Sequence, residues 1–226
     1  MLELNEQTAA DYLRSCGHVG AQEPVQVTEL AGGVSNVVLL VTLPGRGERF
    51  ILKQARGQLR VKEQWLCPVE RIWREAEVLW TCGEVLQSTE CGLRNAEQLS
   101  AAWPFQPGVP NVVWEDRENY CFAMTAAPPK NRTWKDMLLR GRTRLSNPIA
   151  VAAGRLLGRL HAASWQNAVV ANQFEDRTYF DRLRLDPYYR HAARNNPDLA
   201  PRLEELIDSV WKSRLCLVHG LSLIHI

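Results

Sequence analysis

The chain has 226 residues, of which 46% are apolar and 23% charged, and its net charge is +2. This composition is typical of a folded globular protein, and the near-neutral charge argues for neither a nucleic-acid nor a membrane partner. The first residues carry acid where a secretory signal carries base, and no apolar run approaches the roughly 18 residues that span a bilayer. We therefore expect a cytoplasmic protein.

The first half of the chain has the pattern of a β-rich unit with a leading helix and one longer helix. Asn5 can cap a helix over residues 5–16, and Gly17 can end it. Pro68 suits a first helical position, and the apolar spacing after it predicts a helix to about residue 86. Alternating or β-branched runs predict strands at 25–31, 34–43, 48–55, 111–115 and 119–125.

The second half of the chain is expected to be helical. Residues 126–129 (AAPP) break the strand pattern and predict a linker. Apolar spacing beyond them predicts helices at 133–140, 148–165, 176–184 and 198–213, followed by a strand at 215–218. We therefore expect an α+β protein with two lobes that divide after residue 127.

A glycine-containing turn joins the first two predicted strands, and it reads Gly32-Gly33-Val34-Ser35-Asn36. Paired glycines allow the backbone to approach a ligand closely, and free amide N–H groups can then meet phosphate oxygens. A plain hairpin turn is the alternative interpretation of the same residues.

Lys53 is a charged residue at the end of the apolar run Phe50-Ile51-Leu52. A Lys one hairpin after a glycine-rich turn can reach nucleotide phosphates, although a solvated edge Lys also fits the pattern. A phosphate-directed Lys needs an anionic partner that holds its side chain extended. Glu75, one step from the apolar stripe of the predicted helix, is the first candidate, and Glu77 competes with it.

An apolar strand runs into small residues at 120–127, and Met124 to Ala127 could present backbone groups to an adenine edge. A plain buried strand and loop is an equal alternative. In the second half, His161 fits a packing role better than catalysis. Residues that fit either a substrate site or an ordinary helix surface are Asp176, Tyr179, Phe180, Asp181 and Asp186.

Taken together, these residues resemble the aminoglycoside phosphotransferase family, which comprises small-molecule kinases with a protein-kinase-like fold. The motifs that carry the resemblance, over residues 25–220, are Ala31-Gly32-Gly33-Val34-Ser35-Asn36, Phe50-Ile51-Leu52-Lys53, Arg74-Glu75-Ala76-Glu77, Leu157-Gly158-Arg159-Leu160-His161 and Leu217-Val218-His219-Gly220. The resemblance implies a two-lobed α+β fold, with an antiparallel nucleotide-binding lobe over 1–127 and a helical, incomplete lobe over 128–220.

The resemblance also implies roles for individual residues. Gly32 to Asn36 would cover the phosphates of ATP, Lys53 would contact them, and Glu75 would orient Lys53. Met124 and Ala126 would belong to the hinge that binds adenine. The implied reaction transfers the γ-phosphoryl group of ATP, with Mg²⁺, to a hydroxyl of a small molecule.

The chain departs from the family pattern at its end. His219-Gly220 begins the catalytic-loop motif, but Leu221 stands where the resemblance expects the catalytic Asp, and the metal-binding Asn and Asp beyond it are absent. Residues 221–226 (LSLIHI) are what CTG TCT CTT ATA CAC ATC encodes, which resembles a transposon-end sequencing adaptor. We therefore expect an artefactual tail on a truncated ATP-dependent kinase that is inactive as it stands.

Two alternatives belong to other functional classes. One is a non-catalytic, pseudokinase-like module that binds nucleotide, and the other is a structural interaction domain in which the glycine turn is a plain hairpin. The residue after Gly220 in the parent gene separates the kinase from the pseudokinase-like module. Stabilisation by nucleotide separates both of them from the structural domain.

Overall fold

The computed structural model describes residues 2–30, 33–60, 65–88, 108–129, 131–141 and 146–218. The chain forms two compact units, residues 1–83 with 109–131 and residues 84–108 with 132–226. All five strands belong to the first unit, and most of the helices belong to the second. This combination confirms the α+β class predicted from the sequence.

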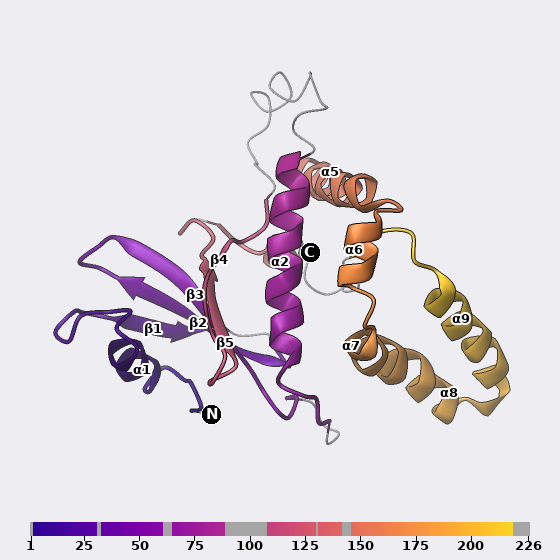
Figure 1. Cartoon of the computed structure of the whole chain (residues 1–226), viewed down its shortest axis with the longest axis horizontal. Helices are drawn as coiled ribbons and strands as arrows, with labels where there is room; N and C mark the ends of the chain where they lie inside the picture. The colour runs from indigo at the N-terminus through magenta and orange to yellow at the C-terminus, as the bar shows by residue number, and fades with distance from the viewer. Residues whose placement is uncertain are drawn as a thin grey trace. The chain divides into compact units, whose positions relative to one another are not determined.

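The first unit is built on a five-stranded antiparallel sheet (Figure 1). Its strands are β1 (Gln26–Glu29), β2 (Asn36–Leu43), β3 (Glu48–Ala55), β4 (Val112–Asp116) and β5 (Cys121–Thr125). They lie in the order β1-β2-β3-β5-β4, so β3 is the central strand. Because directly paired residues of antiparallel strands share a face, the register decides which side chains meet each helix.

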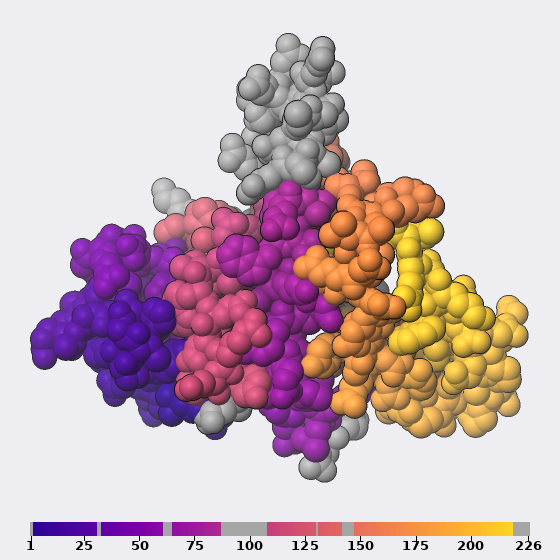
Figure 2. All heavy atoms as spheres, in the orientation of Figure 1, coloured from indigo at the N-terminus to yellow at the C-terminus, as the bar shows by residue number. Residues whose placement is uncertain are grey.

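A helix covers each face of this sheet (Figure 1). Helix α1 (Ala9–Ser15) packs on one face against the odd-numbered residues of β2, Val37, Leu39, Val41 and Leu43, together with Leu52 and Cys121. Helix α2 (Arg71–Ser88) packs on the other face through Ile72 and Ala76, against Ala55, Val112 and Phe122. The atoms of β4 and β5 lie beside those of α2 in Figure 2. The alternation along each strand therefore places two separate apolar clusters on the two faces.

Both helices of the first unit begin later than the sequence predicted. The Oδ1 of Asn5 accepts hydrogen bonds from the N–H groups of Gln7 and Thr8, at 2.8 and 3.0 Å, so Asn5 closes a turn that precedes α1. Pro68 is likewise followed by a turn, and α2 begins at Arg71. The predicted end at Gly17 is confirmed, because Gly17 has φ +75°, the left-handed conformation that commonly ends a helix.

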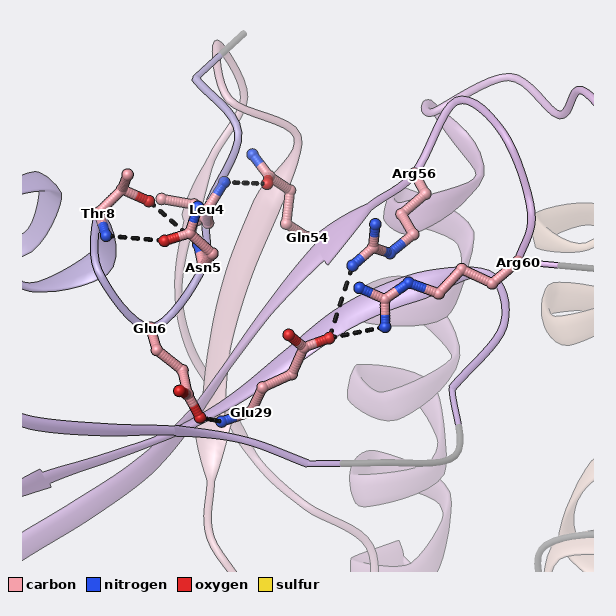
Figure 3. Close-up of polar contacts among 8 residues, drawn as sticks. All are labelled: Leu4, Asn5, Glu6, Thr8, Glu29, Gln54, Arg56 and Arg60. Carbon is pink, nitrogen blue, oxygen red and sulfur yellow. Dashed lines mark hydrogen bonds and ion pairs between the residues drawn. The ribbon is translucent and has the colours of Figure 1, made fainter.

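A buried glutamine fastens the N-terminal segment to the sheet. Gln54 is 2% exposed, and its Oε1 accepts from the N–H of Leu4 at 2.8 Å (Figure 3). Its Nε2 donates to the carbonyls of Leu2 and Asn119, at 2.6 and 2.9 Å. A buried amide without partners would be destabilising, and these bonds satisfy it. The buried strand can therefore hold a polar residue at Gln54, because the backbone of neighbouring segments bonds its amide.

A second polar contact joins α1 to the turn after β4. The hydroxyl of Tyr12 donates to the Oδ2 of Asp116 at 2.7 Å and lies 3.2 Å from the Sγ of Cys121. Burial by itself would raise the pKa of Asp116, but hydrogen bonds from Asn119, Tyr12 and backbone N–H groups lower it below its usual value. Burial raises the pKa of the Cys121 thiol to about 12, so this cysteine stays protonated.

The second unit contains short helices and one long one. These are α4 (Trp134–Leu139), α5 (Ser146–Ser164), α6 (Ala168–Gln173), α7 (Thr178–Phe180), the π-helix η3 (Asp181–Arg190), α8 (His191–Asn195), the 3₁₀-helix η4 (Pro197–Leu199) and α9 (Ala200–Lys212). Helix α9 packs against α8 and η3, with Ile207 and Leu185 buried. Within the described ranges, no helix has the length and apolar character needed to cross a bilayer.

Two predictions for the second unit are wrong. The predicted helix 176–184 is instead the single turn α7 followed by the π-helix η3, which contains Pro187. The predicted strand at 215–218 finds no partner strand among the described residues. The carbonyl of Leu215 accepts from the N–H of Gln166 at 2.8 Å, and the N–H of Leu217 donates to the Oγ of Ser164 at 3.0 Å. The end of α5 therefore holds this segment.

The Tyr12–Asp116 hydrogen bond predicts a pH-dependent loss of stability. Tyr12→Phe should lower the free energy of unfolding by about 1 kcal/mol at pH 7, because the charged Asp116 loses one donor. Asp116 has a lowered pKa, so its contribution is present above the pKa of an unfolded Asp, about 4, and is lost as the pH falls through its folded pKa.

Urea unfolding at pH 7 and pH 3 measures this effect. The difference between the wild type and Tyr12→Phe should be smaller at pH 3, and Tyr188→Phe is the matched control, since Tyr188 is 53% exposed. A difference of the same size at both pH values would contradict the assignment.

Candidate functional site

Lys53 lies in the central strand β3, on the face that carries α2. Its paired residues are Val38 in β2 and Phe122 in β5, and Phe122 belongs to the apolar cluster under α2. Apolar side chains of the two neighbouring strands therefore flank Lys53, and 17% of its side chain is exposed. An ammonium group in this environment needs a polar partner, because its desolvation is otherwise unfavourable.

Glu75 of α2 supplies that partner. The ammonium of Lys53 contacts the Oε1 of Glu75, as the sequence predicted for this pair. Glu75 precedes the buried Ala76 and follows Ile72 by three positions, so helical spacing turns it toward the sheet. The competing candidate Glu77 instead pairs with Arg74 at 2.7 Å. Glu75 is 37% exposed, and a pair of this kind contributes at most about 1 kcal/mol, so its main effect is to fix the direction of Lys53.

The turn at residues 33–35 leads into β2 and folds over the same face. A Cβ atom added to Gly33 would lie 3.3 Å from the carbonyl oxygen of Asn36 and 3.7 Å from the Cγ2 of Val38. Val38 is paired with Lys53 and therefore shares its face. The backbone at Gly33 thus approaches β2 closely on the side of Lys53, which a glycine allows without displacing its neighbours.

The carbonyl groups of Val34 and Ser35 accept hydrogen bonds, whereas the amide groups of the turn are open, which means that they donate no hydrogen bond within the described residues. The Val34 carbonyl accepts from the N–H of Arg60 at 2.8 Å, and the Ser35 carbonyl accepts from the N–H of Arg56 at 3.1 Å. The N–H groups of Gly33, Val34 and Ser35 donate to no other residue that the structure describes. Val34 is 47% exposed, so these amide groups lie in an accessible part of the chain.

The same two arginines also join the turn to the end of β1. The Oε1 of Glu29 lies 2.8 Å from the Nη1 of Arg60 and 3.5 Å from the Nη2 of Arg56 (Figure 3). The N–H of Glu29 donates to the Oε1 of Glu6 at 2.7 Å. The turn is therefore held on its outer side by an ion-pair cluster and at its carbonyls by the chain after β3.

Asn36 ends the turn and points toward α2. It is 9% exposed, and its Nδ2 donates to the Oε2 of Glu75 at 3.1 Å. Arg71, in the first turn of α2, donates to the Oδ1 of Asn36 at 3.4 Å. Arg71 was not predicted as a site residue from the sequence. Its spacing of four residues from Glu75, which places both on one face of a helix, was the available signal.

The residues expected at the adenine hinge lie at the end of β5. Met124 is paired with Ile51, two positions from Lys53 on the same face, and Ala126 follows the last residue of the strand. Val38, Leu40 and Met124 are partly buried on this face. The side chains next to Lys53 therefore form an apolar surface.

Three predicted site residues lie outside the described part of the chain, and two others pair with arginines in the second unit. Gly32, His219 and Gly220 lie outside the described residues. Asp181 pairs with Arg190 at 2.8 Å and Asp186 with Arg194 at 3.1 Å in the second unit. Each of these two carboxylates is thus occupied by an arginine of its own helical region.

A comparison with known protein families identifies the family of the chain. The model described as the phosphotransferase enzyme family, APH, matches residues 26–220, which contain the turn, Lys53 and Glu75. No curated protein gives a significant match to the chain. The antiparallel sheet with accompanying helices is consistent with the kinase-like fold of that family. Because the matched region covers most of its 226 residues, the chain belongs to the phosphotransferase enzyme family that includes the aminoglycoside phosphotransferases.

Proposed function

We propose that this protein is built for ATP-dependent transfer of the γ-phosphoryl group to a hydroxyl of a small molecule. The observation that carries the proposal is the Lys53–Glu75 pair, which lies on the same face of the sheet as a glycine turn with open amide groups. Phosphoryl transfer depends mostly on positioning and on stabilising charge, and this arrangement offers both to a phosphate chain.

The turn and Lys53 suit the phosphates of the nucleotide. Backbone N–H groups that point out of a turn bind anions through their partial positive charge, and those of Gly33, Val34 and Ser35 are open among the described residues. The ammonium of Lys53 adds a full positive charge on the same face. Glu75 holds that ammonium in one place, so a phosphate would meet a preorganised donor.

The apolar surface next to Lys53 suits the base of the nucleotide. Val38, Leu40 and Ile51 form a continuous side-chain surface across β2 and β3, and Met124 extends it to β5. Adenine binding sites combine such apolar surfaces with a few backbone groups at their edge. In our proposal, the backbone after β5, at Ala126, meets the adenine edge.

The residues of the described chain do not fit Mg²⁺. No group of three His, Cys, Asp or Glu side chains gathers to hold a metal within the described ranges. In the family to which the chain belongs, Mg²⁺ would neutralise phosphate charge, and its ligands follow the catalytic Asp. No step of our proposal passes through the metal.

The proposal for the chain as it stands is narrower. Leu221 directly follows His219-Gly220, where the catalytic base would stand, and Leu has no group that can accept a proton. We infer that residues 1–127 act as a nucleotide-binding lobe, that residues 128–220 form part of a helical lobe, and that this chain does not transfer phosphate. A cytoplasmic location and a small-molecule partner, rather than a nucleic acid or a membrane, complete the proposal.

Leu221 also favours one alternative function, a non-catalytic nucleotide-binding module. The two candidates share every residue of the nucleotide site and differ only in the catalytic loop. Sequencing the parent gene across the codon after Gly220 separates them. An Asp codon supports the kinase, and a Leu codon followed by the same five residues, Ser222 to Ile226, supports the binding module.

Nucleotide binding should stabilise the chain through Lys53. At a concentration of a non-hydrolysable ATP analogue near 100 times its Kd, the wild type should gain about 2.7 kcal/mol of unfolding free energy. Lys53→Ala should lose most of this gain, while Lys135→Ala, an exposed lysine in α4, should keep it. Thermal unfolding with and without the analogue measures both. An equal gain in wild type and Lys53→Ala would contradict the phosphate site.

Catalysis is expected to be absent in the 226-residue chain. Incubation with ATP, Mg²⁺ and a panel of amino alcohols, sugars and aminoglycosides should produce no ADP above the enzyme-free rate, because Leu221, directly after Gly220, cannot act as a base. Release of ADP that needs the metal, and that Lys53→Ala abolishes, would contradict this expectation.

A further inference from the structure

A buried arginine at the start of α2 connects the parts of the proposed nucleotide site. Arg71 is 6% exposed, although an arginine guanidinium is charged at every accessible pH. Within the described part of the chain, its guanidinium donates to the carbonyls of Ser35, Arg56, Cys67 and Pro68 and to the Oδ1 of Asn36, which belong to three segments. The donors of this buried cation are therefore used to hold the glycine turn, the end of β3 and the start of α2 together.

The side-chain amide of Asn36 links this arginine to Glu75. Its oxygen faces the guanidinium of Arg71 at 3.4 Å, and its nitrogen donates to the Oε2 of Glu75 at 3.1 Å. The opposite orientation of the amide would set its NH₂ group against a cation and its oxygen against a carboxylate. The charges on both sides therefore determine the amide orientation.

The two oxygens of Glu75 have different partners. Oε2 accepts from Asn36, and Oε1 contacts the ammonium of Lys53. A glutamate side chain has three rotatable bonds, so a contact with Lys53 alone would leave its carboxylate free to swing. The second contact fixes the plane of the carboxylate and, through it, the position of the Lys53 ammonium.

We propose that Asn36 and Arg71 are positioning residues that hold Glu75, and through it Lys53, in register with the glycine turn. This inference rests on the proposed nucleotide-binding function. It assigns Asn36 to the support of Glu75, whereas the family resemblance implied that Asn36 covers the phosphates. Because Arg71 binds the Ser35 carbonyl as well as Asn36, one side chain sets both the phosphate-facing turn and the lysine.

We call the series of contacts from Arg71 through Asn36 and Glu75 to Lys53 the relay. The relay should affect the binding of the phosphates and not the binding of the base. The apolar surface of Val38, Leu40 and Ile51 contains none of its members. The informative quantity is therefore the ratio of the Kd of adenosine to the Kd of a non-hydrolysable ATP analogue, which isolates the contribution of the phosphates. A variant that only loosens the fold would weaken the binding of both ligands. A misdirected Lys53 would weaken the binding of the analogue and leave that of adenosine unchanged, which lowers the ratio.

Asn36→Asp is the sharpest variant. It has nearly the same shape and keeps an acceptor for Arg71, but it removes the donor to Glu75 and sets two carboxylates side by side. We expect the ratio to fall roughly tenfold or more, with adenosine affinity within about twofold of the wild type, since one lost charged contact is worth about that factor. Asn172→Asp, the same substitution on the exposed surface of α6, should leave both affinities unchanged.

A double-mutant cycle tests whether Asn36 acts through Glu75. Asn36→Ala should lower the ratio in the wild-type background and have no further effect in Glu75→Ala, because its target is then gone. Arg71→Lys keeps the charge, but a single ammonium cannot donate to all the oxygens that the guanidinium bonds. It should therefore lower the ratio as well.

The outcomes separate the two levels of the proposal. Isothermal titration in which the wild type binds the analogue no more tightly than adenosine overturns the proposed function, and the relay with it. A wild-type preference for the analogue that persists in Asn36→Asp, or an Asn36→Ala effect of equal size with and without Glu75, overturns the relay alone. A preference lost in Asn36→Asp with adenosine binding intact supports the relay.

Discussion

The structure of the first unit depends on a positive charge in the middle of an apolar sheet. Lys53 lies in the central strand, between Val38 and Phe122, on a face that a helix covers. Such a position is unfavourable for an ammonium unless a counter-charge is close. Glu75 meets this need, and it can do so only because α2 packs on that face through Ile72 and Ala76. The apolar packing of α2 therefore decides whether Lys53 has a counter-charge.

The two faces of the sheet use polar groups differently. On the α1 face, Gln54 and the Tyr12–Asp116 contact fasten the N-terminal segment, and their hydrogen bonds are made within the protein. On the α2 face, the polar groups form an ordered series that ends at Lys53 and at open amide groups. Hydrogen-bond donors that remain accessible are expected at a ligand site. Hydrogen bonds whose donor and acceptor both belong to the protein stabilise the fold.

Sequence reasoning predicted the parts that depend on local pattern. The alternation of β-branched residues marked all five strands, and the order of glycine turn, Lys53 and Glu75 identified a pair that meets in space. It overlooked Arg71, because the partners of that side chain are carbonyl oxygens of Ser35, Arg56 and Cys67, and a carbonyl has no mark in the sequence. The π-helical hydrogen bonding of Asp181–Arg190 is likewise a backbone property that residue types do not reveal.

The most direct test of the phosphate site observes the turn itself. Amide NMR spectra of the chain, recorded with a non-hydrolysable ATP analogue and with adenosine, report on the N–H groups of Gly33, Val34 and Ser35. Our account predicts large shifts of these three amides with the analogue and small ones with adenosine, because only the analogue brings phosphate oxygens to the turn. Binding of the analogue that leaves all three amides unmoved would contradict it.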